Sequence, residues 1–280
     1  MNLTMTGIAA LILVAAALPG ATVLQPAANM YAKPTTDSEV VSQAIYGTNV
    51  DVVEQKDAWG RVRTADNYTG WMPLADLRND RSYATAGRVA EVQALAAHLY
   101  RETDVVKHAP LLTVPFETKL EVIAEPPGKE RWLEVRLPDD RTAWVQHGDV
   151  AFEAKPMSIA ETLEFSKRFI GRPYTWGGAS SFGYDCSGFV QMLCRRRGVI
   201  VPRDARLQVK WDGVTPVDRK DVAPGDLLYF GSSKKVTHTG YYLGDGKFIN
   251  ATTHGTPTIH IDDLNEPYWT RILVGIRRLK

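Results

Sequence analysis

The sequence predicts two small β-barrels followed by a domain that combines helices with strands. Short runs of β-forming residues separated by turns fill residues 23–82, and the same pattern recurs over residues 83–155. Residues 156–280 instead contain stretches with helical spacing of apolar residues and a strand pair joined by Asp-Gly. Residues 1–22 are mostly apolar and stand apart from all three.

Composition sets broad limits on what the chain can do. Its 280 residues are 44% hydrophobic and 23% charged, which is ordinary for two or three globular domains with buried cores. The formal net charge of +1 gives no electrostatic basis for binding nucleic acid. The two cysteines, Cys186 and Cys194, would lie roughly 12 Å apart on one helix, too far for a disulfide. No cysteine pair has zinc-site spacing, and we expect neither a metal nor a cofactor.

Residues 1–22 are interpreted as a secretory leader. An apolar run from Ile8 to Leu18 precedes small residues near Pro19, which fits a hydrophobic region followed by a cleavage zone. No lysine or arginine precedes the run, so an uncleaved anchor is the alternative. We expect export to the periplasm or the extracellular cell wall, without a stable membrane partner.

The two β modules are predicted to be copies of one another. The segment 59–71 aligns without a gap with the segment 132–144, and a tryptophan stands at both ends of each. An earlier segment, 28–31, parallels 97–100 in the same way. This internal similarity indicates a tandem duplication. The first module is expected to contain strands at Val40–Ala44, Val50–Glu54, Arg61–Thr64 and Tyr68–Met72.

In the third domain, a helix is predicted to begin at a cysteine. Asp185 is a good N-cap, so Cys186 becomes the first helical residue, and Gly198 ends the helix. The basic run Arg195–Arg197 is explained as the last turn of this helix. A thiol at a helix N-terminus meets the positive end of the dipole, which favours the nucleophilic thiolate. The alternative is an inert cysteine packed in the core.

A cysteine nucleophile needs a base and a polar group that orients the base. His238 is the candidate base, at the beginning of a strand that turns through Asp-Gly. With a loop at 244–246, His238 faces Thr252, and Asn250 and His254 are its diagonal neighbours. A slip of one residue would turn Asn250 away, so both remain candidate orienters.

Five motifs of residues 156–280 together resemble the NlpC/P60 cysteine peptidases. They are Gly-Arg-Pro-Tyr-Thr-Trp-Gly-Gly (171–178), Tyr-Asp-Cys-Ser-Gly-Phe-Val (184–190), Pro-Arg-Asp-Ala-x-x-Gln (202–208), Pro-Gly-Asp-Leu-Leu-Tyr-Phe (224–230) and the segment from His238 to Ala251. Residues 25–153 resemble tandem bacterial SH3 domains. The whole chain is similar to the γ-D-glutamyl-L-diamino acid endopeptidases of the dipeptidyl-peptidase VI type, which recycle murein peptides.

The resemblance implies a papain-like α+β fold for 156–280 and assigns roles to individual residues. It implies a catalytic Cys186–His238 pair whose third residue, twelve positions after the histidine, is Asn250, where many members have His. The residues that it places around the substrate, including its free N-terminal L-Ala, are Asp185, Ser187, Tyr174, Asp204 and Tyr68. In some relatives an acid of the first SH3-like domain also contacts the amine, and the corresponding position here holds Thr48.

The expected function is hydrolysis of the γ-D-Glu–L-diamino acid bond, with Lys or meso-diaminopimelate, in murein peptides with a free N-terminal L-Ala. The expected partner is therefore the peptide L-Ala-γ-D-Glu-diamino acid, bound by a monomer. One alternative is a peptidoglycan amidase or endopeptidase that cuts intact sacculi. Another is a wall-binding protein whose third domain is inactive.

Overall fold

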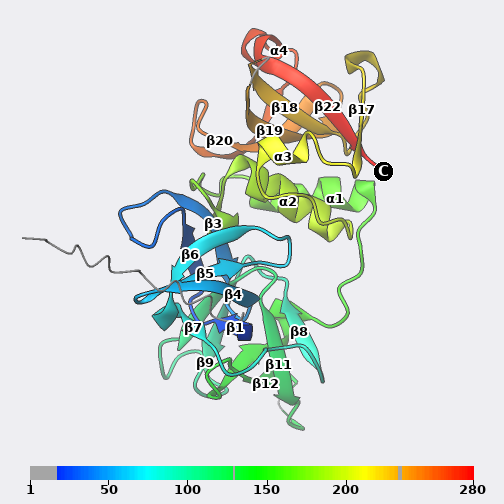
Figure 1. Ribbon diagram of the computed structural model, residues 1–280. Coiled ribbons are helices and arrows are strands. Elements are labelled where there is room, and N and C mark those ends of the chain that lie inside the picture. Colours follow the sequence, from blue (N-terminus) through cyan, green and yellow to red (C-terminus); the bar gives the residue numbers. More distant parts are fainter. Residues whose placement is uncertain (1–17, 129, 233–234) are drawn as a thin grey trace, which may run out of the picture.

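The computed structural model describes residues 18–128, 130–232 and 235–280. Figure 1 shows two strand-rich modules below a C-terminal domain that contains the helices. No helix within the described residues is long and apolar enough to cross a membrane. The predicted leader lies outside the described residues up to position 17. From Leu18 onward its residues belong to the first strand.

The first module is a seven-stranded antiparallel sheet. Its strands follow the order β3-β2-β6-β5-β4-β1-β7. The strands are β1 (Leu18–Val23), β2 (Ala27–Tyr31), β3 (Val40–Ile45), β4 (Asn49–Lys56), β5 (Trp59–Arg63), β6 (Thr69–Pro73) and β7 (Leu77–Arg78), with a 3₁₀ turn η1 at Leu74–Asp76. β3 to β6 coincide with the four predicted strands.

The start predicted for this module, residue 23, is too late. β1 pairs with β4 and with β7, and its residues Ala21, Thr22 and Val23 are buried. Residues 18–22, which the sequence pattern assigned to the leader, therefore belong to a strand of this sheet. The predicted boundaries at 82/83 and 155/156 fall in connections, since β7 ends at Arg78 and β14 at Ala151.

The second module repeats the strand order of the first. Its sheet runs β10-β9-β13-β12-β11-β8-β14, which matches the first sheet strand for strand. The strands are β8 (Val89–Val92), β9 (Ala96–Tyr100), β10 (Leu112–Pro115), β11 (Lys119–Ala124), β12 (Trp132–Arg136), β13 (Thr142–Gln146) and β14 (Val150–Ala151), with η2 at His147–Asp149.

Equivalent aromatic pairs mark the same position in both modules. Tyr31 meets Trp59 edge to face, with ring centroids 5.6 Å apart and an interplanar angle of 88°. Tyr100 meets Trp132 in the same way, at 5.5 Å and 87°. The segments that align in sequence therefore also occupy equivalent positions in the two modules, because each Tyr–Trp pair joins the second strand of its module to the fifth.

The C-terminal domain is a six-stranded antiparallel sheet with helices on it. The sheet runs β17-β22-β18-β19-β20-β21. Its strands are β17 (Val214–Pro216), β18 (Leu227–Ser232), β19 (Lys235–Gly244), β20 (Lys247–Thr252), β21 (Thr258–Asp263) and β22 (Leu273–Leu279), and a small hairpin is formed by β15 (Ala179–Ser180) and β16 (Gly183–Tyr184). The helices are α1 (Ile159–Ser166), α2 (Cys186–Arg196), α3 (Ala205–Gln208) and α4 (Pro267–Ile272), with 3₁₀ turns η3 (Lys167–Phe169) and η4 (Arg219–Asp221).

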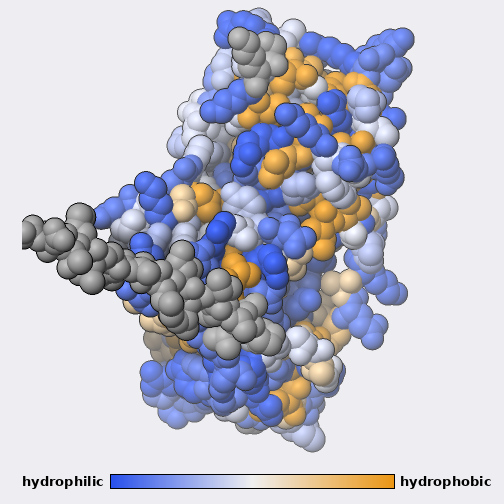
Figure 2. Space-filling model, viewed as in Figure 1, coloured by the Kyte–Doolittle hydropathy of each residue, from blue (hydrophilic) through white to orange (hydrophobic). Residues whose placement is uncertain are grey.

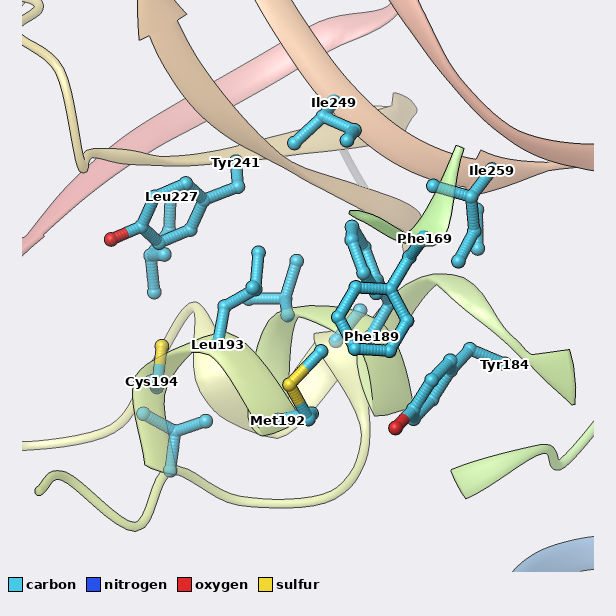
Figure 3. Close-up of a cluster of buried hydrophobic side chains, with 14 of the residues drawn as sticks. Phe169, Tyr184, Phe189, Met192, Leu193, Cys194, Leu227, Tyr241, Ile249 and Ile259 are labelled. Carbon is cyan, nitrogen blue, oxygen red and sulfur yellow. The ribbon is translucent and has the colours of Figure 1, made fainter. Parts of the chain in front are cut away.

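Both faces of this sheet are covered, which explains the unbroken apolar run of β18. Leu227 and Tyr229 pack with α1 and α2, whereas Leu228 and Phe230 pack with Trp269 of α4. A strand buried on both faces loses the alternation of polar and apolar residues. Figure 3 shows α2 side chains meeting the sheet in the core between the sheet and helices α1 and α2. Tyr241 and Leu227 lie at one end of this core, and Phe169 and Tyr184 lie at the other.

Helix α2 is buried almost all round because the β modules cover the side that faces away from the sheet. Arg195 forms a two-pronged ion pair with Glu117, with Nη2 to Oε2 at 2.6 Å and Nε to Oε1 at 3.2 Å. Arg196 binds Glu91 at 2.6 Å. The basic run is therefore more than a helix end, contrary to the sequence interpretation, because two of its three arginines anchor the second module.

A cavity of about 830 Å³ lies where the three parts of the chain meet. Its lining includes Tyr46 and Asp66 of the first module, Glu117 of the second, and Gln191 and Arg196 of α2. Cys186 does not line it. On the face seen in Figure 2, hydrophilic residues extend over the modules and the C-terminal domain alike, with hydrophobic residues in separate groups between them.

Candidate active site

Cys186 stands at the first position of α2, as the sequence predicts. The carboxylate of Asp185 caps the helix by accepting from the amide of Gly188 at 2.7 Å. The cysteine is 8% exposed. The backbone amide of Thr239, the residue that follows His238, acts on the sulfur of Cys186 and lowers the pKa of the thiol.

His238 is held by Asn250, and the strand register explains why. Tyr241 pairs with Ile249 across β19 and β20, which is the register that places His238 opposite Thr252. Asn250 Oδ1 then lies 2.7 Å from His238 Nε2. The other candidate orienter, His254, instead stacks on Tyr268, with ring centroids 3.8 Å apart. Of the two candidates, the structure brings Asn250 to the imidazole.

Aromatic rings fix the plane of the His238 imidazole. Trp269 of α4 stacks on it with centroids 5.4 Å apart and an interplanar angle of 28°. Phe230 of β18 lies against it at 5.6 Å. With Asn250 bound at Nε2, Nδ1 is the imidazole nitrogen that faces away from Asn250.

Burial disfavours the charged forms of both Cys186 and His238. Burial raises the pKa of Cys186 to about 12, and the negative charge of Asp185 adds to this effect. Burial also lowers the pKa of His238 to about 4, although the bond to Asn250 and the charge of Asp262 oppose it. Burial therefore opposes the thiolate that the helix N-terminus favours, and the amides of Thr239 and Ser187 act in the same direction as the helix.

Arg203 is a site residue that the sequence reasoning missed. It is 2% exposed, and its guanidinium binds both oxygens of Asp185, at 2.9 and 2.7 Å. It also donates to the hydroxyls of Ser187 and Ser42 and to the carbonyl of Gly178. A buried carboxylate requires a cation or several donors. Asp185, placed beside a buried helix, was the signal that could have predicted this partner.

Of the remaining predicted substrate residues, Ser187 contacts Asp185 and Arg203. Burial raises the pKa of Tyr174, and Cys186 and Asp185 add to this shift. Tyr68 of the first module donates to Asp204 Oδ1 at 3.1 Å. Thr48, in contrast, lines the three-way cavity. Within the described residues, no group of three or more His, Cys, Asp or Glu side chains could hold a metal ion.

Contacts from β3 hold the first module against the loops of the site. Ser42 accepts from Arg203, as described above, and Gln43 Oε1 accepts from the amide of Ala179 at 3.1 Å. Glu39 accepts from the indole of Trp176. Gly177, with φ +70°, approaches Val40 so closely that a Cβ would meet the Val40 carbonyl at 2.6 Å. The glycine-rich turn thus allows the two parts to touch.

Comparison with known proteins places this site in a family. A profile described as the NlpC/P60 family matches residues 171–278, and one described as the bacterial dipeptidyl-peptidase Sh3 domain matches residues 30–77. A Bacillus cereus (strain ATCC 10987 / NRS 248) protein named gamma-D-glutamyl-L-lysine dipeptidyl-peptidase is 31% identical over 262 residues, covering 87% of this chain and 76% of that protein. The chain belongs to the NlpC/P60 family.

Further NlpC/P60 relatives match along most of their length. "Dipeptidyl-peptidase 6" of Lysinibacillus sphaericus is 28% identical, covering 89% of this chain and 93% of that protein. The crystal structure of an NlpC/P60 family protein from Bacillus cereus ATCC 10987 matches with a TM-score of 0.81 and 26% identity, covering 93% of this chain and 99% of that chain. The similarity therefore includes the β modules as well as the C-terminal domain.

Proposed function

We propose that this protein is a cysteine endopeptidase that hydrolyses the γ-D-Glu–L-diamino acid bond of murein peptides with a free N-terminal L-Ala. The observation that carries the proposal is the Cys186–His238–Asn250 arrangement, with the first module packed at its edge. Two relatives that match along most of this chain are named gamma-D-glutamyl-L-lysine dipeptidyl-peptidase, which supports the same bond. The diamino acid is lysine or meso-diaminopimelate.

The reaction is acyl transfer through a thioester. His238 Nδ1 takes the proton of the Cys186 thiol as the sulfur attacks the γ-carbonyl carbon of D-Glu. By helix geometry the Cys186 amide has no intrahelical partner, so it is free to donate to the developing oxyanion. The imidazolium then gives its proton to the leaving amine of the diamino acid. Water, deprotonated by neutral His238, finally hydrolyses the thioester and releases the thiol.

Preference for a free N-terminus arises from the edge of the site that the first module covers. Tyr68 and Asp204 join the module to the C-terminal domain at 3.1 Å, close to the Asp185–Arg203 pair. Arg203 compensates the charge of Asp185, whereas the other partner of Asp204 is the exposed Arg206. We place the substrate ammonium beside Asp185 and Asp204, because Asp204 has no buried cation of its own among the ion pairs of the described residues.

We also propose that both β modules are SH3-like barrels and that the protein acts as an exported monomer. The identical strand order supports the second SH3-like assignment. The apolar residues before β1 support export. N-terminal sequencing of the protein secreted by its native host, together with light scattering of the purified chain, tests these two points.

Digestion of defined peptides tests the proposed activity. We expect L-Ala-γ-D-Glu-L-Lys or its meso-diaminopimelate counterpart to yield the dipeptide L-Ala-D-Glu and the free diamino acid, detected by mass spectrometry. The N-acetylated tripeptide should be cut at least tenfold more slowly, because it lacks the ammonium. Intact sacculi should release little material. Comparable rates on sacculi and tripeptide would favour the sacculus-cutting alternative instead.

The variant Cys186→Ala separates catalysis from binding. It should abolish hydrolysis of the tripeptide while the protein stays folded, because the sulfur is the proposed nucleophile. Cys194→Ala is the matched control, since Cys194 is buried in the core on the same helix and should leave activity intact. Wild-type protein that binds sacculi but cuts neither substrate would favour a wall-binding protein.

A further inference from the structure

We infer that Asp262 is a positioning residue for His238, which acts by fixing the orientation of the Asn250 amide and through it the imidazole tautomer. The inference rests on the peptidase chemistry proposed above, because it concerns the base of that site. It adds a fourth residue to the Cys186–His238–Asn250 arrangement. The argument starts from the strand that lies behind Asn250.

β21 pairs with β20 and brings Asp262 to Asn250. In this register Asn250 faces His260, so Asp262, two residues further on, is its diagonal neighbour on the same face. Asn250 Nδ2 donates to Asp262 Oδ2 at 2.9 Å and to the carbonyl of His260 at 3.3 Å. Asn250 is fully buried, and the Asp262 side chain is 14% exposed. The amide nitrogen therefore has two protein acceptors.

These two acceptors determine which end of the amide faces His238. A carboxylate and a carbonyl can only accept, so the NH₂ end of Asn250 must point toward Asp262 and His260. The oxygen end then points toward His238 Nε2, 2.7 Å away, and can only accept. Nε2 must consequently carry the proton, and Nδ1 keeps its lone pair for the Cys186 thiol. Without Asp262 only one acceptor holds the amide, which could then rotate.

Asp262 also supplies the negative charge that Asn250 cannot. An amide orients the imidazole but carries no charge, whereas the reaction passes through an imidazolium. Asp262 raises the pKa of His238, as Asp185 does from the start of α2, and His254 lowers it from the end of β20. His260 Nε2 lies 3.3 Å from Asp262 Oδ2 and would share this carboxylate when protonated. Among these ionisable side chains, Asp262 is the one that is hydrogen-bonded to Asn250.

Three variants separate the charge of Asp262 from its hydrogen bond. Asp262→Asn keeps an acceptor oxygen and loses the charge, so kcat/KM should fall about tenfold. The acid limb of the pH profile of kcat/KM should move to lower pH in this variant, because loss of the carboxylate lowers the pKa of His238. Asp262→Ala loses the acceptor as well, and kcat/KM should fall about a hundredfold. Asp263→Asn is the matched control, since this neighbouring carboxylate binds Lys247 instead, and its activity should stay unchanged.

A second measurement needs no substrate. In protein labelled with ¹⁵N-histidine, the His238 resonances should show a protonated Nε2 in wild type and in Asp263→Asn, and a mixture of tautomers in Asp262→Ala. If Asp262→Ala does not fold, the same spectrum is read in Asp262→Asn, which should keep the Nε2–H form at a lower pKa. A wild type that cuts no murein peptide would refute the proposed function while this tautomer result still stood.

Two outcomes would overturn the inference. One is wild-type kcat/KM, pH profile and tautomer in both Asp262 variants. The other is a loss of activity in Asp262→Asn with an unmoved acid limb and an unmoved His238 pKa, because that pattern belongs to a residue that only stabilises the fold. A parallel loss in Asp263→Asn would likewise assign the effect to the strand rather than to Asp262.

Discussion

At the scale of single residues, Asp185 has two structural roles. It caps α2 through Gly188 and forms a buried ion pair with Arg203. Both interactions hold this carboxylate in place at the start of the helix, so α2 begins at a fixed point and fixes the position of Cys186. A substrate ammonium would add a fourth partner to a carboxylate that already accepts from Arg203, the Gly188 amide and the Ser187 hydroxyl. The helix cap and the ion pair with Arg203 thus occupy most of the acceptor capacity of Asp185, and a substrate ammonium would use the rest.

The reactivity of Cys186 should report a neutral resting thiol. Because burial raises its pKa to about 12, the fraction of thiolate at pH 7 is small and grows as pH rises. Alkylation by iodoacetamide should therefore accelerate about tenfold per pH unit between pH 7 and 9, without a plateau. Mass spectrometry of the modified peptide gives the rate, with Cys186→Ala as the blank. A plateau below pH 8 would show a thiolate–imidazolium pair at rest.

At the scale of elements, α2 is fixed at both ends by different parts of the chain. Its first turn carries the nucleophile and the Asp185 cap. Its last turn is anchored to the second module by Arg195–Glu117 and Arg196–Glu91. Since the helix is one rigid rod, a module bound at its C-terminal end also helps to set the position of the thiol. The arginines thus connect the second module to the site.

Removing Glu91 should destabilise the protein strongly. Arg196 is 8% exposed, and in Glu91→Ala its remaining ion-pair partner would be Glu117 at 3.9 Å. A buried guanidinium left with only this longer contact should reduce the free energy of unfolding by about 3 kcal/mol, measured by urea denaturation. In the control Glu54→Ala, which breaks an exposed pair with Arg61, the loss should stay below about 1 kcal/mol. Equal losses would contradict this role of Glu91.

Much of this architecture could be predicted from local pattern. The strands β3 to β6, the start and end of α2, and the register of β19 with β20 all follow from residues near one another in sequence. Arg203, Asp262 and the roles of Arg195 and Arg196 could not be predicted in this way. Their partners come from other segments, and a buried ion pair leaves no periodic signal in the chain.

The choice between Asn250 and His254 shows the same limit within the site. Both are diagonal neighbours of His238, and spacing alone left both open. The structure separates them because His254 lies beyond the end of β20 and stacks on Tyr268, a residue of α4 that local pattern could not place there. The effect of burial on the pKa of Cys186 could not be predicted for a similar reason, since desolvation depends on everything that surrounds the thiol.

At the scale of the whole molecule, the β modules complete the C-terminal domain. Phe116 of the second module belongs to the core of that domain, with its ring 5.3 Å from Phe165 and 5.9 Å from Phe169. Its amide donates to Ser181 Oγ, which in turn donates to the carbonyl of Leu95. The first module adds Ser42 to the donors and acceptors around Arg203. The three parts therefore share one core and one polar network.

The isolated segment 156–280 should consequently be less stable and less active than the full chain. Its α2 would expose residues that the modules bury, and Phe116 would be missing from the aromatic cluster, a loss worth about 3 kcal/mol by itself. We expect a lower thermal midpoint by circular dichroism and a kcat/KM for the tripeptide reduced at least tenfold.

Full-length Tyr68→Phe is the matched variant: it removes only the bond to Asp204, so KM should rise while the thermal midpoint stays unchanged. A fragment with the midpoint and kcat/KM of the full chain would show that the modules are mere spacers.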